Sequence, residues 1–254
     1  MKKICTVCSL KGGTGKTVSS LALAAANAKT KKTLLVDLDA QANSTISLGV
    51  DPTELKASVS EVLTDNKPAK SVIVQTAIKN LDLLPSSIKL AVEMERLYTK
   101  VFREAILSKA LKKIAKDYSR IIIDCAPSLN VLTTNALYAG EFILIPCQTS
   151  RYGLDGLADL LNKIQEIKNQ SAKEQGNSVG ILLTQLDKRN SKTNDWVLEQ
   201  LQPFKHIMFK TIINRNETLN QAVIAQQSIF AYDSKSQGAK DYTTLSKELA
   251  GRMK

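Results

Sequence analysis

The stretch LKGGTGKT at residues 10–17 decides how this sequence folds. It follows a short apolar run at residues 3–9, and a segment of small, helix-forming residues continues over 16–29. A strand, a glycine-rich loop and a helix in this order are typical of phosphate-binding sites. Glycines let backbone N–H groups approach the anion, and the helix N-terminus adds a favourable dipole. Lys16 supplies a cation for the β- and γ-phosphates, and the Thr17 hydroxyl can ligate Mg²⁺. The residues expected to contact a nucleotide here are Lys11, Gly12, Gly13, Thr14, Gly15, Lys16, Thr17 and Val18.

The loop departs from the strict pattern G-x-x-x-x-G-K-[ST], because Leu10 occupies the first glycine position. What is present is K-G-G-x-G-K-T, which carries an extra lysine, Lys11. The alternative interpretation is an ordinary glycine-rich turn with Lys11 as a solvated surface charge. The match of all seven residues between a strand and a helix favours nucleotide binding.

Short β-rich runs alternate with longer helical patterns along the rest of the chain. Strands are expected at residues 3–9, 33–37, 81–84, 120–124, 142–146, 179–184 and 207–212. Helices are expected at residues 16–29, 93–116, 128–138, 153–168, 194–201, 217–226 and 236–252. Several of the strands are continuously apolar, as strands covered on both faces must be. The alternation predicts an α/β protein with a doubly wound, mainly parallel sheet and helices on both faces, in one domain over residues 1–254.

Two acidic segments follow apolar strands. Residues 33–36 lead into Asp37 and Asp39, and residues 121–123 lead into Asp124. Because the carboxyl ends of parallel strands converge on the ligand crevice, these carboxylates are expected near the phosphates. Of the first two, one could support Mg²⁺ through water and the other could orient the attacking water. A single Asp at a strand end is often only a helix cap, so the interpretation depends on the loop and the acids together.

Composition excludes several classes of protein. The 254 residues are 43% apolar with only 11 Gly and 6 Pro, which excludes collagenous and disordered chains. No apolar run approaches the roughly 20 residues of a spanning helix, and no secretory signal precedes the first strand, so a cytoplasmic protein is expected. The formal charge of +11 favours a polyanionic partner, either nucleic acid or an acidic lipid surface. Solubility alone is the alternative explanation for this charge.

Cysteine and histidine usage does not indicate a metal or redox centre. Cys5, Cys8, Cys125 and Cys147 lie in apolar runs, where a free thiol behaves as a small hydrophobe. Cys5 and Cys8 have CxxC spacing, but no second Cys or His pair follows, so zinc and disulfide interpretations are weak. His206 is the only histidine, which excludes histidine-based catalytic triads unless this one residue serves.

These motifs resemble those of the ParA/Soj partition ATPases, within the wider MinD/ParA group of P-loop ATPases. The loop at 11–17 is similar to the family's deviant Walker A motif, and DLDAQAN at 37–43 is similar to its D-x-D-P-Q-x-N segment. IIIDCAPSL at 121–129 and TNAL at 134–137 resemble the Walker B region and the helix after it. The resemblance covers most of the chain, because residues 146–157, 184–189 and 233–236 also fit.

The resemblance implies a Mg²⁺-dependent ATPase that works as a switch. Two ATP-bound subunits would form a homodimer, in which Lys11 acts on the partner's phosphates and Lys16 and Thr17 act within their own subunit. Asp39 would act on the hydrolytic water. The implied catalytic residues are Lys11, Lys16 and Asp39, and the implied metal residues are Thr17, Asp37 and Asp124.

The resemblance also implies the partners. The ATP dimer would bind double-stranded DNA without sequence specificity, in the cytoplasm on the nucleoid, and the chain's positive charge agrees with this. A ParB-like protein would stimulate slow hydrolysis and release the DNA, so that chromosome or plasmid DNA is segregated. Asn214 and Arg215 match the region near the adenine in relatives and are expected nucleotide contacts. The candidate DNA contacts are Lys188, Arg189, Lys205, Lys210, Arg215, Lys235 and Lys240.

The sequence departs from the family pattern in places, and three alternatives stay open. Val18 stands where a second hydroxyl residue is common, and Asn214 and Thr218 replace a proline and a basic residue. The chain starts at its first strand, so no N-terminal helix-turn-helix extension is expected. The alternatives are a ParA-like ATPase that positions a protein cargo, a MinD-like membrane-associated ATPase that regulates the division site, and a metabolic P-loop enzyme. A membrane partner is not expected, because the apolar stripe at 242–253 is narrow and suits packing on the sheet.

Overall fold

The fold is built on one seven-stranded sheet. The computed structural model describes residues 2–150, 154, 156–170, 178–187 and 189–254. Across the sheet the strands follow the order β3-β4-β2-β5-β1-β6-β7, and all neighbours are parallel except the pair β3 and β4. The strands are β1 (Ile4–Val7), β2 (Thr33–Leu38), β3 (Val74–Gln75), β4 (Leu81–Leu84), β5 (Arg120–Cys125), β6 (Phe142–Gln148) and β7 (Ser178–Thr184).

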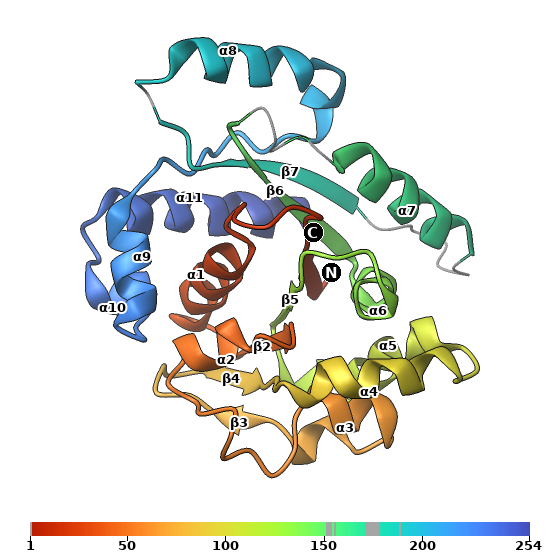
Figure 1. Cartoon of the computed structure of the whole chain (residues 1–254). Helices are drawn as coiled ribbons and strands as arrows, with labels where there is room; N and C mark the ends of the chain where they lie inside the picture. The colour runs from red at the N-terminus through yellow and green to blue at the C-terminus, as the bar shows by residue number, and fades with distance from the viewer. Residues whose placement is uncertain (1, 151–153, 155, 171–177, 188) are drawn as a thin grey trace.

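Helices cover both faces of this sheet (Figure 1). Their bounds are α1 (Lys16–Ala28), α2 (Asn43–Ser47), α3 (Val59–Thr64), α4 (Lys89–Tyr98), α5 (Ile106–Lys112), α6 (Val131–Ala139), α7 (Leu157–Gln170), α8 (Ser191–Gln200), α9 (Glu217–Ile224), α10 (Ile229–Tyr232) and α11 (Gln237–Arg252). Short 3₁₀ helices are η1 (Ala69–Ser71), η2 (Arg103–Ala105), η3 (Ala115–Asp117) and η5 (Gln202–Ile207). Helices α1, α9, α10 and α11 share one core cluster, and α3 to α8 share the other.

The central strands are apolar throughout because each face meets helices. In β2, Leu34 and Val36 belong to one core cluster and Leu35 to the other, as side chains alternate across a strand. In β5, Ile121 and Ile122 divide between the clusters in the same way. The prediction of a doubly wound, mainly parallel α/β fold is therefore confirmed.

The helix expected at residues 93–116 is wrong as a single element. The chain forms α4, then a turn in which Phe102 has a left-handed φ of 53°, then η2 and α5. The Asn135 side chain of α6 fixes this break, because its Nδ2 donates to the Arg103 carbonyl at 2.7 Å and its Oδ1 accepts from the Leu107 N–H at 3.1 Å. A contact to a residue far along the chain overrides the local helical preference here.

The strand expected at residues 207–212 is also wrong. Only isolated bridges join this region to β7 and its end, through Met208 and Asn214. The Glu248 carboxylate of α11 accepts hydrogen bonds from the N–H groups of Lys210 and Thr211, both at 2.9 Å. These donors are therefore used by a side chain instead of a strand ladder. The expected pattern also missed β3 and the short helices α2, α3 and α10.

The C-terminal helix α11 packs on the sheet beside α1, as expected. Tyr242, Leu245, Leu249 and Met253 are all buried. The Tyr242 hydroxyl lies 2.9 Å from the Ser19 hydroxyl of α1, which joins the last helix to the helix that follows the glycine-rich loop. Among the described residues, no helix combines the length and the apolarity needed to cross a membrane.

Candidate nucleotide site

The glycine-rich loop connects β1 to α1 at the carboxyl edge of the sheet. Gly13 and Gly15 have left-handed φ values of 74° and 84°, which an L side chain rarely adopts. The end of β7 holds the loop in place, because the Thr184 hydroxyl donates to the Thr14 carbonyl at 2.8 Å and the Gln185 amide donates to the Gly13 carbonyl at 2.6 Å. The loop conformation is thus fixed by residues about 170 positions away in the sequence.

Lys16 opens α1 and is buried, with 7% of its surface exposed. Its ammonium group donates to the Lys11 carbonyl at 2.8 Å, across the loop. Burial lowers the pKa of Lys16, and the nearby Asp124 carboxylate opposes that shift. A desolvated cation at a helix N-terminus beside glycine-rich backbone is suited to binding phosphate.

Asp37 and Asp124 lie side by side on neighbouring strands. The two residues are direct partners in the register of β2 and β5, and both are fully buried. Burial, reinforced by repulsion from Asp124, raises the pKa of Asp37 to about 7. Burial also raises the pKa of Asp124 to about 6. Two buried carboxylates without a neutralising ion favour the protonated form, and a bound cation would reverse this.

Hydroxyl groups surround the two carboxylates. The Ser20 and Ser44 hydroxyls donate to the two oxygens of Asp124 at 3.0 and 2.8 Å, and a hydrogen bond from Thr17 also acts on its pKa. The backbone N–H and the hydroxyl of Thr45 both donate to Asp37 Oδ2, at 2.9 and 2.7 Å. The sequence motifs did not predict a role for Ser20, Ser44 or Thr45. The available signal was position: Ser20 lies one helical turn after Lys16, and the other two directly follow the 37–43 segment.

The donors at this site suit Mg²⁺. Mg²⁺ keeps several waters and takes one or two protein oxygens together with phosphate oxygens. Thr17 and Asp124 supply such oxygens, whereas no group of three or more His, Cys, Asp or Glu residues in the described ranges could hold a metal by itself. All four cysteines are free and buried, and burial raises the pKa of Cys5, Cys8 and Cys147 to about 12, so they fit no metal or redox role.

Asp39 lies just past β2 and is only partly buried. Its Oδ1 accepts from the Gln41 N–H at 3.0 Å, and its own N–H donates to Asp37 Oδ1 at 3.2 Å. The two carboxylates are therefore tied to one turn but differ in exposure. Asp39 is accessible to water, while Asp37 is enclosed.

A cavity of about 400 Å³ adjoins the loop on the side of β7. Gly15 and Val18 line it together with Asn214 and Arg215, so the structure brings these four predicted nucleotide contacts to one place. The backbone N–H and the side-chain amide of Asn214 donate to Asp241 Oδ2, both at 3.0 Å. The Arg215 N–H donates to the Leu186 carbonyl at 2.9 Å.

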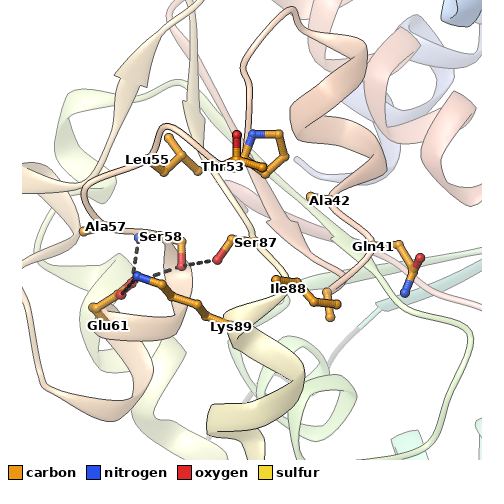
Figure 2. A pocket seen from close by; sticks show the side chains of 12 residues that line it. Gln41, Ala42, Thr53, Leu55, Ala57, Ser58, Glu61, Ser87, Ile88 and Lys89 are labelled. Carbon is orange, nitrogen blue, oxygen red and sulfur yellow. Dashed lines mark hydrogen bonds and ion pairs between the residues drawn. The ribbon is translucent and has the colours of Figure 1, made fainter.

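A separate groove of about 420 Å³ lies beside the Asp39 turn (Figure 2). Gln41 and Ala42 line it at one end, and Ser58 and Glu61 lie at the other. The Ser58 N–H and hydroxyl donate to Glu61 Oε2 at 2.7 and 3.0 Å, which caps α3. The groove and the loop cavity therefore lie next to different parts of the candidate site.

The candidate DNA contacts are spread over several segments. Lys188 lies outside the described residues, and Lys205, Lys210, Lys235 and Lys240 are exposed. Arg189 forms an ion pair with Asp187 at 2.7 Å and holds the pKa of that carboxyl well below its usual range. Arg215 lies 3.8 Å from the same carboxylate. Asp187 thus partly neutralises two of the expected cations.

Strand order, glycine-rich loop, buried lysine and paired aspartates together define a P-loop nucleotide-binding protein of the α/β class. A family model described as an AAA domain matches residues 1–177. The sporulation initiation inhibitor protein Soj of Bacillus subtilis is 38% identical over 251 residues, covering 98% of this chain and 99% of that protein. The chromosome partitioning protein ParA of Myxococcus xanthus is 36% identical over 251 residues, covering 98% and 88%. The chain belongs to the ParA/Soj family of partition ATPases.

A solved structure that is named for a different activity shares the fold of this chain. The cobyrinic acid a,c-diamide synthase of Mycobacterium smegmatis, solved with a bound ATP analogue and magnesium, superposes with a TM-score of 0.84 at 30% identity. The match covers 98% of this chain and 95% of that one. The similarity extends over the whole sheet and both helical layers.

Proposed function

We propose that this protein is an ATP- and Mg²⁺-dependent switch that dimerises with ATP bound and then binds DNA without sequence specificity. Slow hydrolysis, stimulated by a ParB-like partner, would return it to a form that releases DNA. In this way it would segregate chromosome or plasmid DNA on the nucleoid, in the cytoplasm, acting as a single domain over residues 1–254. Membership in the ParA/Soj family supports this function.

The observation that carries the proposal is the arrangement around Lys16. A buried ammonium group lies at the start of α1, near the buried carboxylate of Asp124, and the loop before it contains two glycines with left-handed φ. In this setting the ammonium is a fixed, weakly solvated cation for phosphate oxygens.

The roles of the surrounding residues follow from their positions. Thr17 and Asp124 would hold Mg²⁺, which when bound neutralises charge on the β- and γ-phosphates, and Asp37 would stabilise that site from the neighbouring strand. Asp39, which is open to solvent, would orient the attacking water. Gly15, Val18, Asn214 and Arg215 would line the nucleoside side of the pocket, since they share one cavity. Lys11 would reach the phosphates of the second subunit.

The packing of α11 supports DNA binding over membrane attachment. A MinD-like protein needs an apolar helix that is free to enter a bilayer. Here the apolar side chains of α11 are buried against the sheet and α1. Insertion of this helix would expose part of the core to water.

Dimer formation tests the proposal. The Asp39→Ala variant should bind ATP without consuming it, and we expect its mass by sedimentation to double with ATP and Mg²⁺ but not with ADP. The Lys11→Ala variant should bind nucleotide with little loss and remain a monomer. A doubled mass for Lys11→Ala, or one mass for Asp39→Ala in every nucleotide state, would contradict the proposed switch.

A further inference from the structure

Helix α5 and the following η3 carry a basic stripe, defined here as Lys109, Lys112, Lys113 and Lys116. All four lysines are exposed. Their spacing of three, four and seven residues places them on one side of a helical segment. The stripe extends about 10 Å along the helix axis, at about 1.5 Å for each residue.

Little negative charge lies near this stripe in the sequence. Residues 100–117 contain six Lys and Arg but only two acids, Glu104 and Asp117. In the part of the chain that the structure describes, none of the four lysines forms an ion pair with a carboxylate. By contrast, the C-terminal segment at 187–254 has eleven Lys and Arg against seven acids, and Asp187 pairs with two of its arginines.

Packing against the core fixes the position of the helix that carries the stripe. On the opposite side of α5 and its end, Leu107, Leu111 and Ile114 are buried in the core cluster that α3 to α8 share. The Asn135 side chain also accepts from the Leu107 N–H at 3.1 Å. The apolar side of α5 itself is already covered. Beside the helix, Val101 and Phe102 are exposed, and the Lys109 ammonium lies 5.3 Å from the centroid of the Phe102 ring. The free face of α5 is cationic, which suits a surface of phosphate groups.

We propose that the basic stripe is a binding surface for the phosphate backbone of double-stranded DNA. Duplex DNA carries one charge for about every 1.7 Å of its axis, so four ammonium groups within about 10 Å can each meet a phosphate. The stripe and α11 lie on opposite faces of the sheet (Figure 1). Helix α11 carries the candidate contact Lys240. The stripe is therefore a DNA surface separate from the one that carries Lys240, whereas the candidate contact Lys205 follows α8 on the stripe's own side of the sheet. This inference rests on the proposed DNA binding.

The test replaces all four stripe lysines by alanine in the full chain. A matched control replaces Lys56, Lys67, Lys70 and Lys79, which are also exposed and change the net charge equally. Binding of each protein to a random-sequence duplex is measured by fluorescence anisotropy with ATP and Mg²⁺ across a salt series. Melting temperature and affinity for a fluorescent ATP analogue are measured alongside, and we expect both variants to match the parent.

We expect the stripe variant to bind DNA at least about 10-fold more weakly and to show a salt slope shallower by about 3.6, since each of the four phosphate contacts contributes about 0.9. The control variant should keep the parental slope. Equal slopes for the stripe variant and the parent would overturn the inference and leave the proposed function intact. A parent that binds no DNA with ATP would overturn both. Binding of each protein to anionic lipid vesicles is measured in parallel. If the stripe variant loses vesicle binding but keeps parental DNA binding, the inference is overturned.

Discussion

Asp37 and Asp124 determine the electrostatics of the site at the scale of single residues. Their register on β2 and β5 places two buried carboxylates side by side, with hydroxyl donors on both. The buried ammonium of Lys16 lies near Asp124. The carboxylate of Asp39 is more exposed, and the backbone N–H of Asp39 donates to Asp37 Oδ1. Each group therefore has a distinct environment, and each can be tested by its own substitution.

The buried aspartate predicts a pH-dependent stability. The pKa of Asp37 rises from its ordinary value of 3.8 to about 7, so the folded protein keeps a proton that the unfolded chain releases between about pH 4 and 7. By linkage, the free energy of unfolding of the nucleotide-free protein falls as pH rises through this window. We expect Asp37 to contribute a loss of roughly 1–3 kcal/mol between pH 5 and pH 8. Asp37→Asn should keep only the smaller loss that comes from Asp124, whose pKa is raised to about 6. Urea denaturation in EDTA at each pH measures both losses. Parallel curves for the two proteins would contradict the assignment.

Substitutions of Lys16 and Asp39 should separate binding from hydrolysis. Lys16→Ala removes a charge-assisted hydrogen bond to phosphate, so we expect ATP affinity to fall roughly 10- to 100-fold. Asp39→Ala should keep the parental affinity and lower the hydrolysis rate by roughly 100-fold or more. Asp51→Ala removes an acid from an exposed turn and serves as the control, with the parental rate expected. Parental hydrolysis by Asp39→Ala would remove the water-orienting role.

At the scale of elements, the five-residue helix α2 connects the two strands of the site. Ser44 donates to Asp124 on β5, and Thr45 donates to Asp37 on β2. The Ser86 N–H, just after β4, in turn donates to the Thr45 hydroxyl at 3.0 Å. Three strand ends therefore meet at one short helix.

Removal of the Thr45 hydroxyl should loosen this connection. In Thr45→Val, Asp37 loses a donor and the buried Ser86 N–H loses its acceptor, so we expect the free energy of unfolding to fall by about 1–3 kcal/mol. Thr45→Ser should recover most of this loss. Ser47→Ala is the control in the same helix, because it removes only a bond to the Asn43 carbonyl. A Thr45→Val protein as stable as the parent, measured by urea denaturation, would show that the connection contributes nothing.

The elements also show what the sequence could and could not predict. The structure has the loop at 10–17 between β1 and α1, and it has Asp37 and Asp124 side by side at the ends of β2 and β5, because parallel strands bring their carboxyl ends together. Their roles toward a nucleotide remain predictions. Ser20 and Ser44 were missed, since the hydroxyls meet Asp124 over separations of 104 and 80 residues and serine is common on any surface. The strand expected at 207–212 failed because Glu248 of α11 takes its N–H donors, a tertiary contact that local patterns do not contain.

At the scale of the whole molecule, nucleotide and DNA would act on one connected structure. The loop is held by the end of β7 through Thr184 and Gln185, and α1 is joined to α11 through Ser19 and Tyr242. Movement of the loop on nucleotide binding would thus be transmitted to the end of β7 and, through α1, to α11. The net charge of +11 favours a polyanionic partner, and dimerisation would double the contacts available to one duplex.

In the proposed switch, ATP controls DNA binding. Affinity for a random-sequence duplex, measured with ATP, with ADP and without nucleotide across a salt series, tests it most directly. We expect tight, salt-sensitive binding with ATP alone, and loss of that binding in Lys16→Ala. Equal affinity in all three nucleotide states, or no binding in any of them, would contradict it.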